Sequence, residues 1–280
     1  MVMEKLFKEL CFKLSAKWFR YLAIAIVSIL AVSLLFYFLE VPPVMAQSMV
    51  SKLGFLSVAT AGQKVLFFSP HADDESIAAG GYIAQSVING ADVTIVMVTN
   101  SNAQGIEATR YAEFKKATSI LGVPEANLVF LGFPDGELDS INKAELQAAL
   151  QQQIDKYNPD IIVYPSPHDY NSDHRTIGKA MEMILKTEST PIAAYSYLVH
   201  YELDYPKPRK LAPADYIMPP EHLAKAEKEW LSFDLSSSVE SCKEKAIYTY
   251  QSQIHDLELN GLMHGNIRKN EIFAISKLNN

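Results

Sequence analysis

Residues 64–100 read KVLFFSPHADDESIAAGGYIAQSVINGADVTIVMVTN, and this stretch decides the fold. Two apolar runs, 64–70 and 92–100, flank a segment at 75–90 that has helical spacing and ends in an Asn-Gly pair. Both runs are apolar throughout rather than alternating, which is typical of strands buried on two faces. The stretch therefore predicts a strand, a helix and a second strand parallel to the first.

The same alternation continues along the chain. Further strands are predicted at 127–133, 160–166, 193–203 and 271–276, and further helices at 105–123, 144–157, 174–186, 221–230 and 239–255. Strands separated by helices predict a Rossmann-like α/β fold, with a mostly parallel sheet covered by helices on both faces. Parallel strands bring the loops at their carboxyl ends to one edge of the sheet, where such folds bind their ligands.

Composition narrows the class of protein. The formal net charge of −7 and the lack of a Lys/Arg cluster in the body of the chain argue against binding of nucleic acid. A neutral or polar small substrate fits this charge better. The two cysteines, Cys11 and Cys242, have no metal-ligand spacing and are not expected to pair. Nothing in the sequence indicates an oligomeric state.

The N-terminus carries a segment suited to a membrane. Residues 1–20 are basic, and Tyr21 to Phe38 contain no charged residue. A helix of that length rises roughly 27 Å, close to the thickness of the hydrocarbon core of a bilayer. Positive charge before the apolar segment predicts that the domain after it lies outside the cytoplasm. Cleavage near Ala46, which would release a secreted protein, stays open because Val44 and Ala46 are small.

Four segments are therefore expected. They are a basic cytoplasmic segment at 1–20, a transmembrane anchor or signal helix at 21–41, a linker at 42–62 and an α/β domain at 63–280.

Two polar loops follow predicted strands and concentrate ionisable side chains. The first contains His71, Asp73 and Asp74, and the second, residues 168–174, reads HDYNSDH. Capping of the next helix by an aspartate would explain the first loop alone. Two such loops at one sheet edge favour a metal site instead, since imidazole and carboxylate are ligands that suit zinc.

Several ordered motifs resemble the PIG-L/LmbE-type zinc-dependent de-N-acetylase family. SPHADDESIAAGG resembles the [AS]-H-x-D-D-E motif of that family, and SDHRTIGKA resembles its second metal motif. Weaker matches follow in the expected order, and together the motifs span roughly residues 64–275. They read RYAEFKKATSILGV, FLGFPDGEL, AIYTYQSQ and IRKNEIF.

The resemblance implies one Zn²⁺ per chain, held by three residues, His71, Asp74 and His174. It implies that Asp73 is the general base that activates a zinc-bound water. It also implies that the enzyme removes the N-acetyl group from an N-acetylglucosamine-type amino-sugar conjugate. The sequence does not distinguish zinc from another divalent metal.

The chain departs from the family pattern at one position. Many members carry a histidine three residues before the second ligand histidine, where this chain has Asn171. Asparagine cannot act as an acid, so either Asp73 returns the proton that it took or another histidine acts as the catalytic acid. His168 is the first candidate for that role and His264 the second. Three residues, Arg110, Asp135 and Asn171, are expected to bind substrate.

Two other functions stay open at this level. One is hydrolysis of a different acyl amide, and the other is a catalytically inactive carbohydrate-binding protein on the same fold. Asn171 favours the inactive protein, whereas Asp73 argues against it, because a pure binder gains nothing from a free carboxylate beside a metal.

Overall fold

The computed structural model describes residues 17–35, 46–187, 192–201, 205–226, 229–256 and 259–275. The chain divides into two compact units, residues 1–42 and 43–280. In the first unit, Lys17–Leu35 form a helix of 19 residues with a mean hydropathy of 2.1, long and apolar enough to cross a membrane. The basic residues before Lys17, and the segment 36–45 that precedes the candidate cleavage site, lie outside the described residues.

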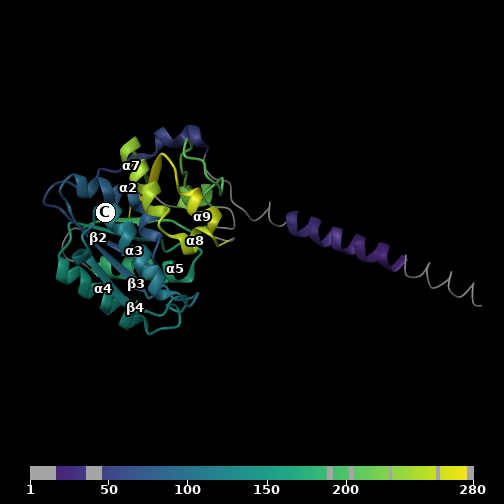
Figure 1. Cartoon of the computed structure of the whole chain (residues 1–280), viewed down its shortest axis with the longest axis horizontal. Helices are drawn as coiled ribbons and strands as arrows, with labels where there is room; N and C mark the ends of the chain where they lie inside the picture. The colour runs from purple at the N-terminus through teal and green to yellow at the C-terminus, as the bar shows by residue number, and fades with distance from the viewer. Residues whose placement is uncertain are drawn as a thin grey trace, which may run out of the picture. The chain divides into compact units, whose positions relative to one another are not determined.

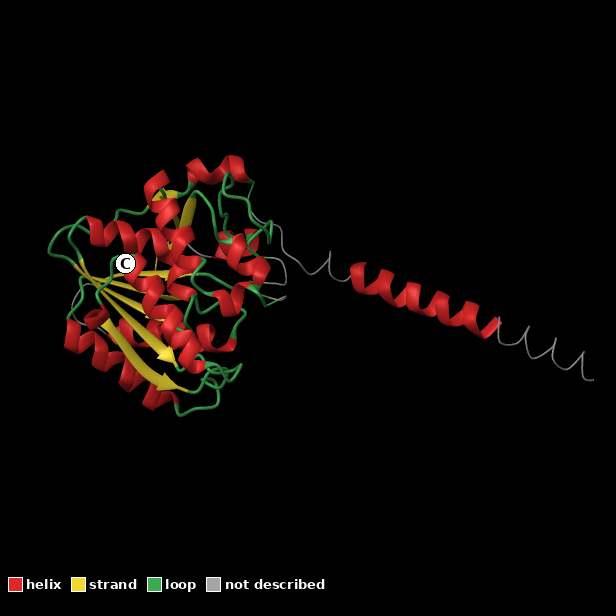
Figure 2. Ribbon diagram, viewed as in Figure 1, coloured by secondary structure: helices red, strands yellow, loops and turns green. Residues whose placement is uncertain are grey.

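The second unit is built on an eight-stranded sheet with the strand order β1-β7-β8-β6-β5-β2-β3-β4 (Figures 1 and 2). The strands are β1 (Gly54–Phe55), β2 (Lys64–Ser69), β3 (Asp92–Thr99), β4 (Leu128–Phe133), β5 (Ile161–Pro165), β6 (Ala193–Tyr197), β7 (Trp230–Asp234) and β8 (Asn270–Ile275). Neighbouring strands are parallel except where β8 pairs with β6 and β7. The expected mostly parallel α/β sheet is confirmed.

Helices cover both faces of the sheet (Figure 2). They are α2 (Asp74–Ile88), α3 (Glu107–Ile120), α4 (Lys143–Tyr157), α5 (Ser172–Thr187), α6 (Glu221–Ala226), α7 (Ser237–Ile247), α8 (Gln251–Ile254) and α9 (Asn260–Gly265), with 3₁₀ helices η1 (Gln47–Lys52) and η2 (Glu125–Asn127). The apolar sides of α2, α3 and α7 pack into one core cluster, and those of α4 and α5 pack into the other.

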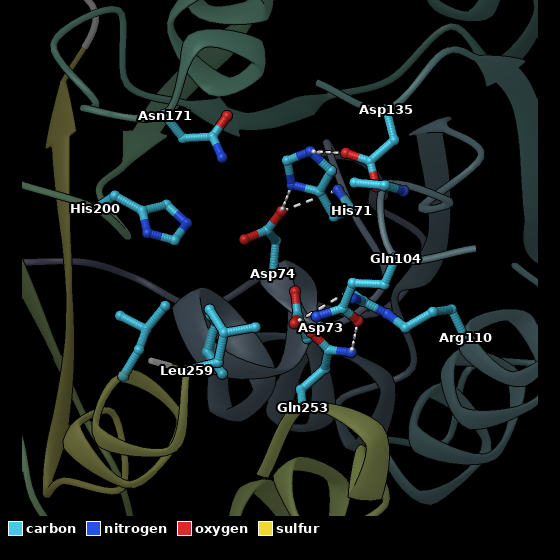
Figure 3. Close-up of a pocket in the computed structure, with 13 residues that line it drawn as sticks. His71, Asp73, Asp74, Gln104, Arg110, Asp135, Asn171, His200, Gln253 and Leu259 are labelled. Atoms are coloured by element: carbon cyan, nitrogen blue, oxygen red, sulfur yellow. Dashed lines mark hydrogen bonds and ion pairs between the residues drawn. The ribbon is translucent and has the colours of Figure 1, made fainter. Parts of the chain in front are cut away.

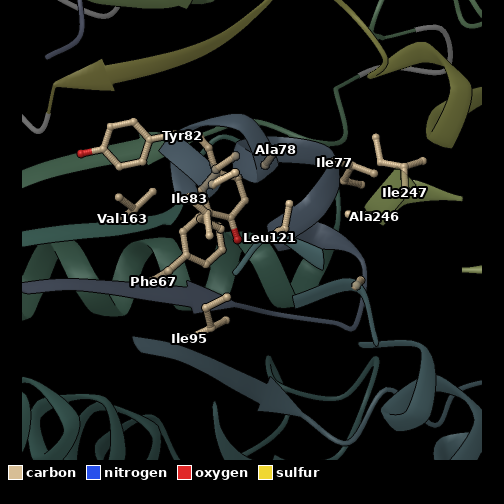
Figure 4. Packing of buried hydrophobic residues seen from close by; sticks show 14 of the residues in the cluster. Phe67, Ile77, Ala78, Tyr82, Ile83, Ile95, Leu121, Val163, Ala246 and Ile247 are labelled. Carbon is tan, nitrogen blue, oxygen red and sulfur yellow. The ribbon is translucent and has the colours of Figure 1, made fainter. Parts of the chain in front are cut away.

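Strand β2 shows how the two cores arise from one sequence. Successive side chains of a strand point to opposite faces. Phe67 accordingly joins the cluster under α2 (Figure 4), and Phe68 joins the cluster under α4 and α5. Both rings are fully buried. Burying an aromatic side chain of this size stabilises the fold by about 1.5–3 kcal/mol. Strand β2 therefore contributes to the hydrophobic core on both faces of the sheet.

Four sequence expectations differ from the structure. The strand expected at 193–203 ends at Tyr197. The helix expected at 221–230 ends at Ala226, and Trp230 instead begins β7. The helix expected at 239–255 is interrupted between α7 and α8. Residues 54–55, expected in a linker, form the edge strand β1. The strands missed, β1 and β7, are short and pair with segments far along the chain, so local pattern carried little signal for them.

The topology places a crevice at the carboxyl ends of β2 and β5. From β2 the chain continues outward through β3 and β4, whereas β5 leads to β6 on the other side. Such a reversal of direction opens a ligand site between the two central strands. Gly178 lets α5 approach this point closely, because a Cβ there would lie 2.5 Å from Pro167 N and 2.6 Å from Pro165 O. The N-terminal half of α5 therefore packs closely against the end of β5 and the loop that follows it.

Candidate metal centre and active site

Three side chains from the two loops converge in the crevice. His71 follows β2, Asp74 is the first residue of α2, and His174 lies in the first turn of α5. Asp74 Oδ2 lies 3.2 Å from His71 Nδ1 and 3.0 Å from His174 Nε2. The two ring nitrogens are 3.3 Å apart. The three donor atoms therefore form a nearly equilateral triangle.

This triangle has the dimensions of one face of a tetrahedral metal site. Zinc bonds of about 2.0–2.1 Å to nitrogen and oxygen separate two ligand atoms by about 3.3–3.4 Å. The observed separations of 3.0–3.3 Å come close to this. Two imidazoles and one carboxylate form the donor set of several catalytic zinc sites, which keep a further position for water or substrate. The residues present thus fit a zinc ion.

Carboxylates on the far side orient the ring of His71. His71 Nε2 lies 3.1 Å from Asp173 Oδ2 and 3.2 Å from Asp135 Oδ1. The backbone N–H groups of Gly136 and Leu138 donate to Asp173 and hold that carboxylate in place. A proton on Nε2 leaves the Nδ1 lone pair directed at the triangle, as a metal ligand requires.

Asp169 orients the ring of His174 in the same way. Its Oδ2 lies 3.3 Å from His174 Nδ1 and accepts hydrogen bonds from the backbone N–H groups of Val199 and His200. Each histidine of the triangle therefore faces a carboxylate through the nitrogen that does not point at the triangle. Such partners fix the ring and raise the basicity of the ligand nitrogen.

The electrostatics of the metal-free cluster favour positive charge. Burial alone would lower the pKa of His71, but hydrogen bonds to Asp135, Asp173 and Asp74 outweigh it and hold this pKa well above its usual value. Burial also opposes protonation of His174, yet the nearby carboxylates of Asp74 and Asp169 raise its pKa to about 9. A divalent cation would satisfy the same carboxylates that otherwise draw protons onto the two rings.

Asp73 points away from the donor triangle. Its backbone has φ 143° and ψ −28°, a conformation that non-glycine residues rarely adopt. Its Oδ2 lies 3.2 Å from Arg110 Nη2, and the same nitrogen donates to the carbonyl of Ala72. Burial raises the pKa of Asp73 to about 7, and the Arg110 guanidinium limits the rise. A carboxylate with a pKa near the working pH is suited to general-base catalysis.

Glu75 lies in the first turn of α2, and its buried side chain also forms hydrogen bonds that hold the loop with Asp73. Its Oε2 accepts a hydrogen bond from the backbone N–H of Asp73, 3.2 Å away. Its Oε1 accepts from the hydroxyls of Ser76 and Tyr250. Burial raises the pKa of Glu75 to about 7. The contact with Tyr250 ties the catalytic loop to the segment between α7 and α8.

A cavity of about 170 Å³ opens onto these groups (Figure 3). Its walls include His71, Asp73, Asp74 and all three residues expected to bind substrate, namely Arg110, Asp135 and Asn171. The structure therefore brings the predicted ligands, base and substrate residues together. Asp135 also contacts His71, so it orients a residue of the triangle as well as lining the pocket.

His168, expected as the catalytic acid, lies elsewhere. Its side chain is exposed and is not among the residues that line the cavity. His200, which follows β6, takes a place in the wall instead. The sequence offered no motif around His200, so only the pairing of β6 with β5 brings it to the site.

The C-terminal segment completes the pocket. Gln253 of α8 donates from Nε2 to Gln104 Oε1 at 3.0 Å, which joins α8 to the loop after β3. Leu259 and Leu262 add apolar surface from the region of α9. Sequence reasoning assigned no site role to these residues, although Gln253 lies within the AIYTYQSQ motif.

Comparisons of sequence agree with the motifs. Residues 66–185 match the family model described as PIG-L: GlcNAc-PI de-N-acetylase. A curated relative, the probable N-acetyl-alpha-D-glucosaminyl L-malate deacetylase 2 of Bacillus anthracis, is 28% identical over 137 residues. This alignment covers 44% of the present chain and 59% of the relative, so the chain spans less than two thirds of the length of that protein. Both matches agree with the family resemblance seen in the motifs.

Comparisons of structure establish the fold. The N,N'-diacetylchitobiose deacetylase from Pyrococcus horikoshii, complexed with its inhibitor, gives a TM-score of 0.57 at 20% identity, over 76% of this chain and 83% of that chain. The zinc-inhibited form of teicoplanin deacetylase Orf2 gives a TM-score of 0.58 at 15% identity, over 76% of this chain and 97% of that chain. At identities this low, the similarity concerns the arrangement of the backbone.

Proposed function

Because residues 66–185 match the PIG-L family, we propose that this protein is a metal-dependent hydrolase that removes an N-acetyl group from an amino-sugar conjugate. One observation carries the proposal. A triangle of metal-ligand atoms, from His71, Asp74 and His174, lies beside a buried carboxylate, Asp73, that takes no part in the triangle.

The chemistry needs both a stronger electrophile and a stronger nucleophile. Bound at the triangle, a divalent metal, for which zinc is our proposal, polarises the amide carbonyl and lowers the pKa of water. Asp73 takes the proton of the attacking water, a contribution of about 10² to 10⁴ in rate. Arg110 holds the Asp73 carboxylate toward the pocket, 3.2 Å away. Asp73 then returns the proton to the departing amine.

The class of substrate follows from the family and its relatives. The matched family, the Bacillus relative and both solved structures are described as deacetylases, and three of these descriptions name an acetylated amino sugar. The cavity combines carboxylates and amides with apolar surface from Ile77, Leu259 and Leu262. Such a wall suits a sugar ring with polar edges and apolar faces. We therefore propose an N-acetylglucosamine-type conjugate as substrate.

The N-terminal helix suggests where the reaction occurs. Lys17–Leu35 has the length and hydropathy of a membrane span. With the basic residues that precede it, we propose that this helix anchors the protein and that the catalytic domain lies outside the cytoplasm. Secretion after cleavage near Ala46 is the alternative. Mass spectrometry of the N-terminus of the mature protein distinguishes the two.

The test measures metal content and amine release together, on the full chain in mild detergent. We expect about one zinc per chain, release of free amine from N-acetylglucosamine glycosides, loss of release with chelator and recovery with added zinc. As a matched pair, Asp74→Asn loses the metal, whereas Asp73→Asn keeps it and loses turnover. Stoichiometric metal without amine release from any acyl amide would contradict the proposal and favour a carbohydrate-binding protein.

A further inference from the structure

The side-chain amide of Asn171 has a fixed orientation. Asn171 Oδ1 accepts hydrogen bonds from the backbone N–H groups of Asp173, at 2.9 Å, and of His174, at 3.4 Å. These N–H groups belong to the first turn of α5, so Asn171 is the N-cap of this helix. Because the oxygen is held by two backbone donors, the NH₂ group must face the opposite way. A flipped amide would place its NH₂ against two N–H groups.

The opposite side is the cavity. Asn171 lines the pocket together with Asp74 and Asp73. In Figure 3, Asn171 and His200 lie on one side of Asp74, while Asp73 and Arg110 lie on the other. A substrate amide at the donor triangle would thus have a base on one side and the Asn171 NH₂ group on the other.

His200 is held in the same wall. Its backbone N–H donates to Asp169 Oδ2, and its carbonyl accepts from the backbone N–H of Tyr170. The His200 ring packs edge-on against the ring of His174, with centroids 5.0 Å apart. An imidazole ring carries at least one N–H donor, and the ring of His200 lines the cavity.

We infer that Asn171 Nδ2 and the His200 ring form a pair of donors for the carbonyl oxygen of the substrate amide. The inference rests on the proposed function, in which negative charge develops on that oxygen as water attacks. Donors fixed before the reaction stabilise such charge without having to reorient. Asn171, found where an acid was expected, would then serve as a fixed hydrogen-bond donor.

Capping of α5 uses the Oδ1 atom of Asn171 and does not require its NH₂ group. Serine and aspartate cap helices about as well as asparagine, but serine carries no second polar group that could reach the cavity. Substitutions at this position can therefore separate the cap from the donor. Asn171→Ser keeps an oxygen for the backbone of α5 and removes the NH₂ group. Asn171→Ala removes both.

The experiment uses the full-length, zinc-loaded chain and compares Asn171→Ser, Asn171→Ala and His200→Phe with the wild type. For Asn171→Ser we expect one zinc per chain, an unchanged Tm and a fall in kcat of about 10² to 10³, as for loss of one oxyanion donor. Asn171→Ala should show the same fall together with a Tm lower by about 2–4 °C, because the cap is lost as well. His200→Phe should lower kcat while it keeps one zinc per chain.

Binding gives a readout that does not depend on turnover. In an Asp73→Asn background, calorimetry compares N-acetylglucosamine with the methylphosphonamide of glucosamine, whose tetrahedral anionic centre mimics the attacked carbonyl. We expect Asn171→Ser to weaken binding of the phosphonamide at least tenfold and to change binding of N-acetylglucosamine less than threefold. Equal weakening of both ligands would indicate a structural role and overturn the inference.

Other outcomes separate this inference from the proposed function. Full turnover by Asn171→Ser would overturn the donor role while the hydrolase proposal stands. If the wild type released no amine, a selective loss of phosphonamide binding in Asn171→Ser would still support the donor role. Failure of the wild type to bind the phosphonamide would overturn that role. Two zinc ions in the wild type and one in His200→Phe would also overturn it, because His200 would then be a ligand.

Discussion

Replacing Asp73 by asparagine tests the central chemical assignment, because this change keeps the shape of the side chain and removes its capacity to take a proton. Asp73 contributes no atom to the donor triangle. We therefore expect Asp73→Asn to bind metal like the wild type and to lose about 10² to 10⁴ in kcat. The loss should appear at every pH, since asparagine does not titrate.

The same substitution should stabilise the metal-free protein, by an amount that depends on pH. Folding raises the pKa of Asp73 from 3.8 to about 7, mainly through burial. Between these values the folded state binds more protons than the unfolded state, so stability falls as pH rises through this window. At 1.36 kcal/mol per pKa unit, the cost of ionising Asp73 reaches about 4 kcal/mol above pH 7. Asparagine avoids this cost.

Urea unfolding of the metal-free full chain measures the effect. Between pH 5 and pH 8, the stability difference between Asp73→Asn and the wild type should grow by about 3 kcal/mol, which is two pKa units of ionisation cost. Asp139→Asn, at an exposed position, controls for the loss of one aspartate. A stability difference that stays constant over this pH range would refute the argument that burial strains the ionised form of Asp73.

Three further predictions follow from the contacts around the site. Asp169→Asn and Asp173→Asn should each weaken zinc affinity about 10- to 100-fold in chelator competition. Each change removes the carboxylate that faces one histidine of the triangle. Unchanged zinc affinity in both variants would contradict the orienting role. Lys243→Met should lower the free energy of unfolding by about 3–5 kcal/mol, because it removes the cation that lies 2.8 Å from the buried carboxylate of Glu271. Lys225→Met, in an exposed ion pair, should leave the urea midpoint unchanged. His168→Ala should change kcat/KM less than about twofold, as expected for an exposed residue outside the pocket, and a loss of a hundredfold or more would restore it as the acid.

The sequence by itself determined the central sheet and the first half of the site. The runs at 64–70 and 92–100 are apolar on both faces, and that pattern is local, so it predicted β2 and β3 without knowledge of their partners. The proposed metal ligands His71, Asp74 and His174 lie in short motifs at the ends of predicted strands. Because parallel strands place such loops at one edge, their meeting also followed from the sequence.

Only the tertiary structure decided the surroundings of that site. Asp173, one residue before His174, contacts His71 of the other loop rather than its own neighbour. His200 and Gln253 reach the cavity from distant parts of the chain, whereas the nearer His168 does not. The physical reason is that short-range pattern reports which face of an element is buried, while the choice of partner depends on packing between segments separated by tens to hundreds of residues.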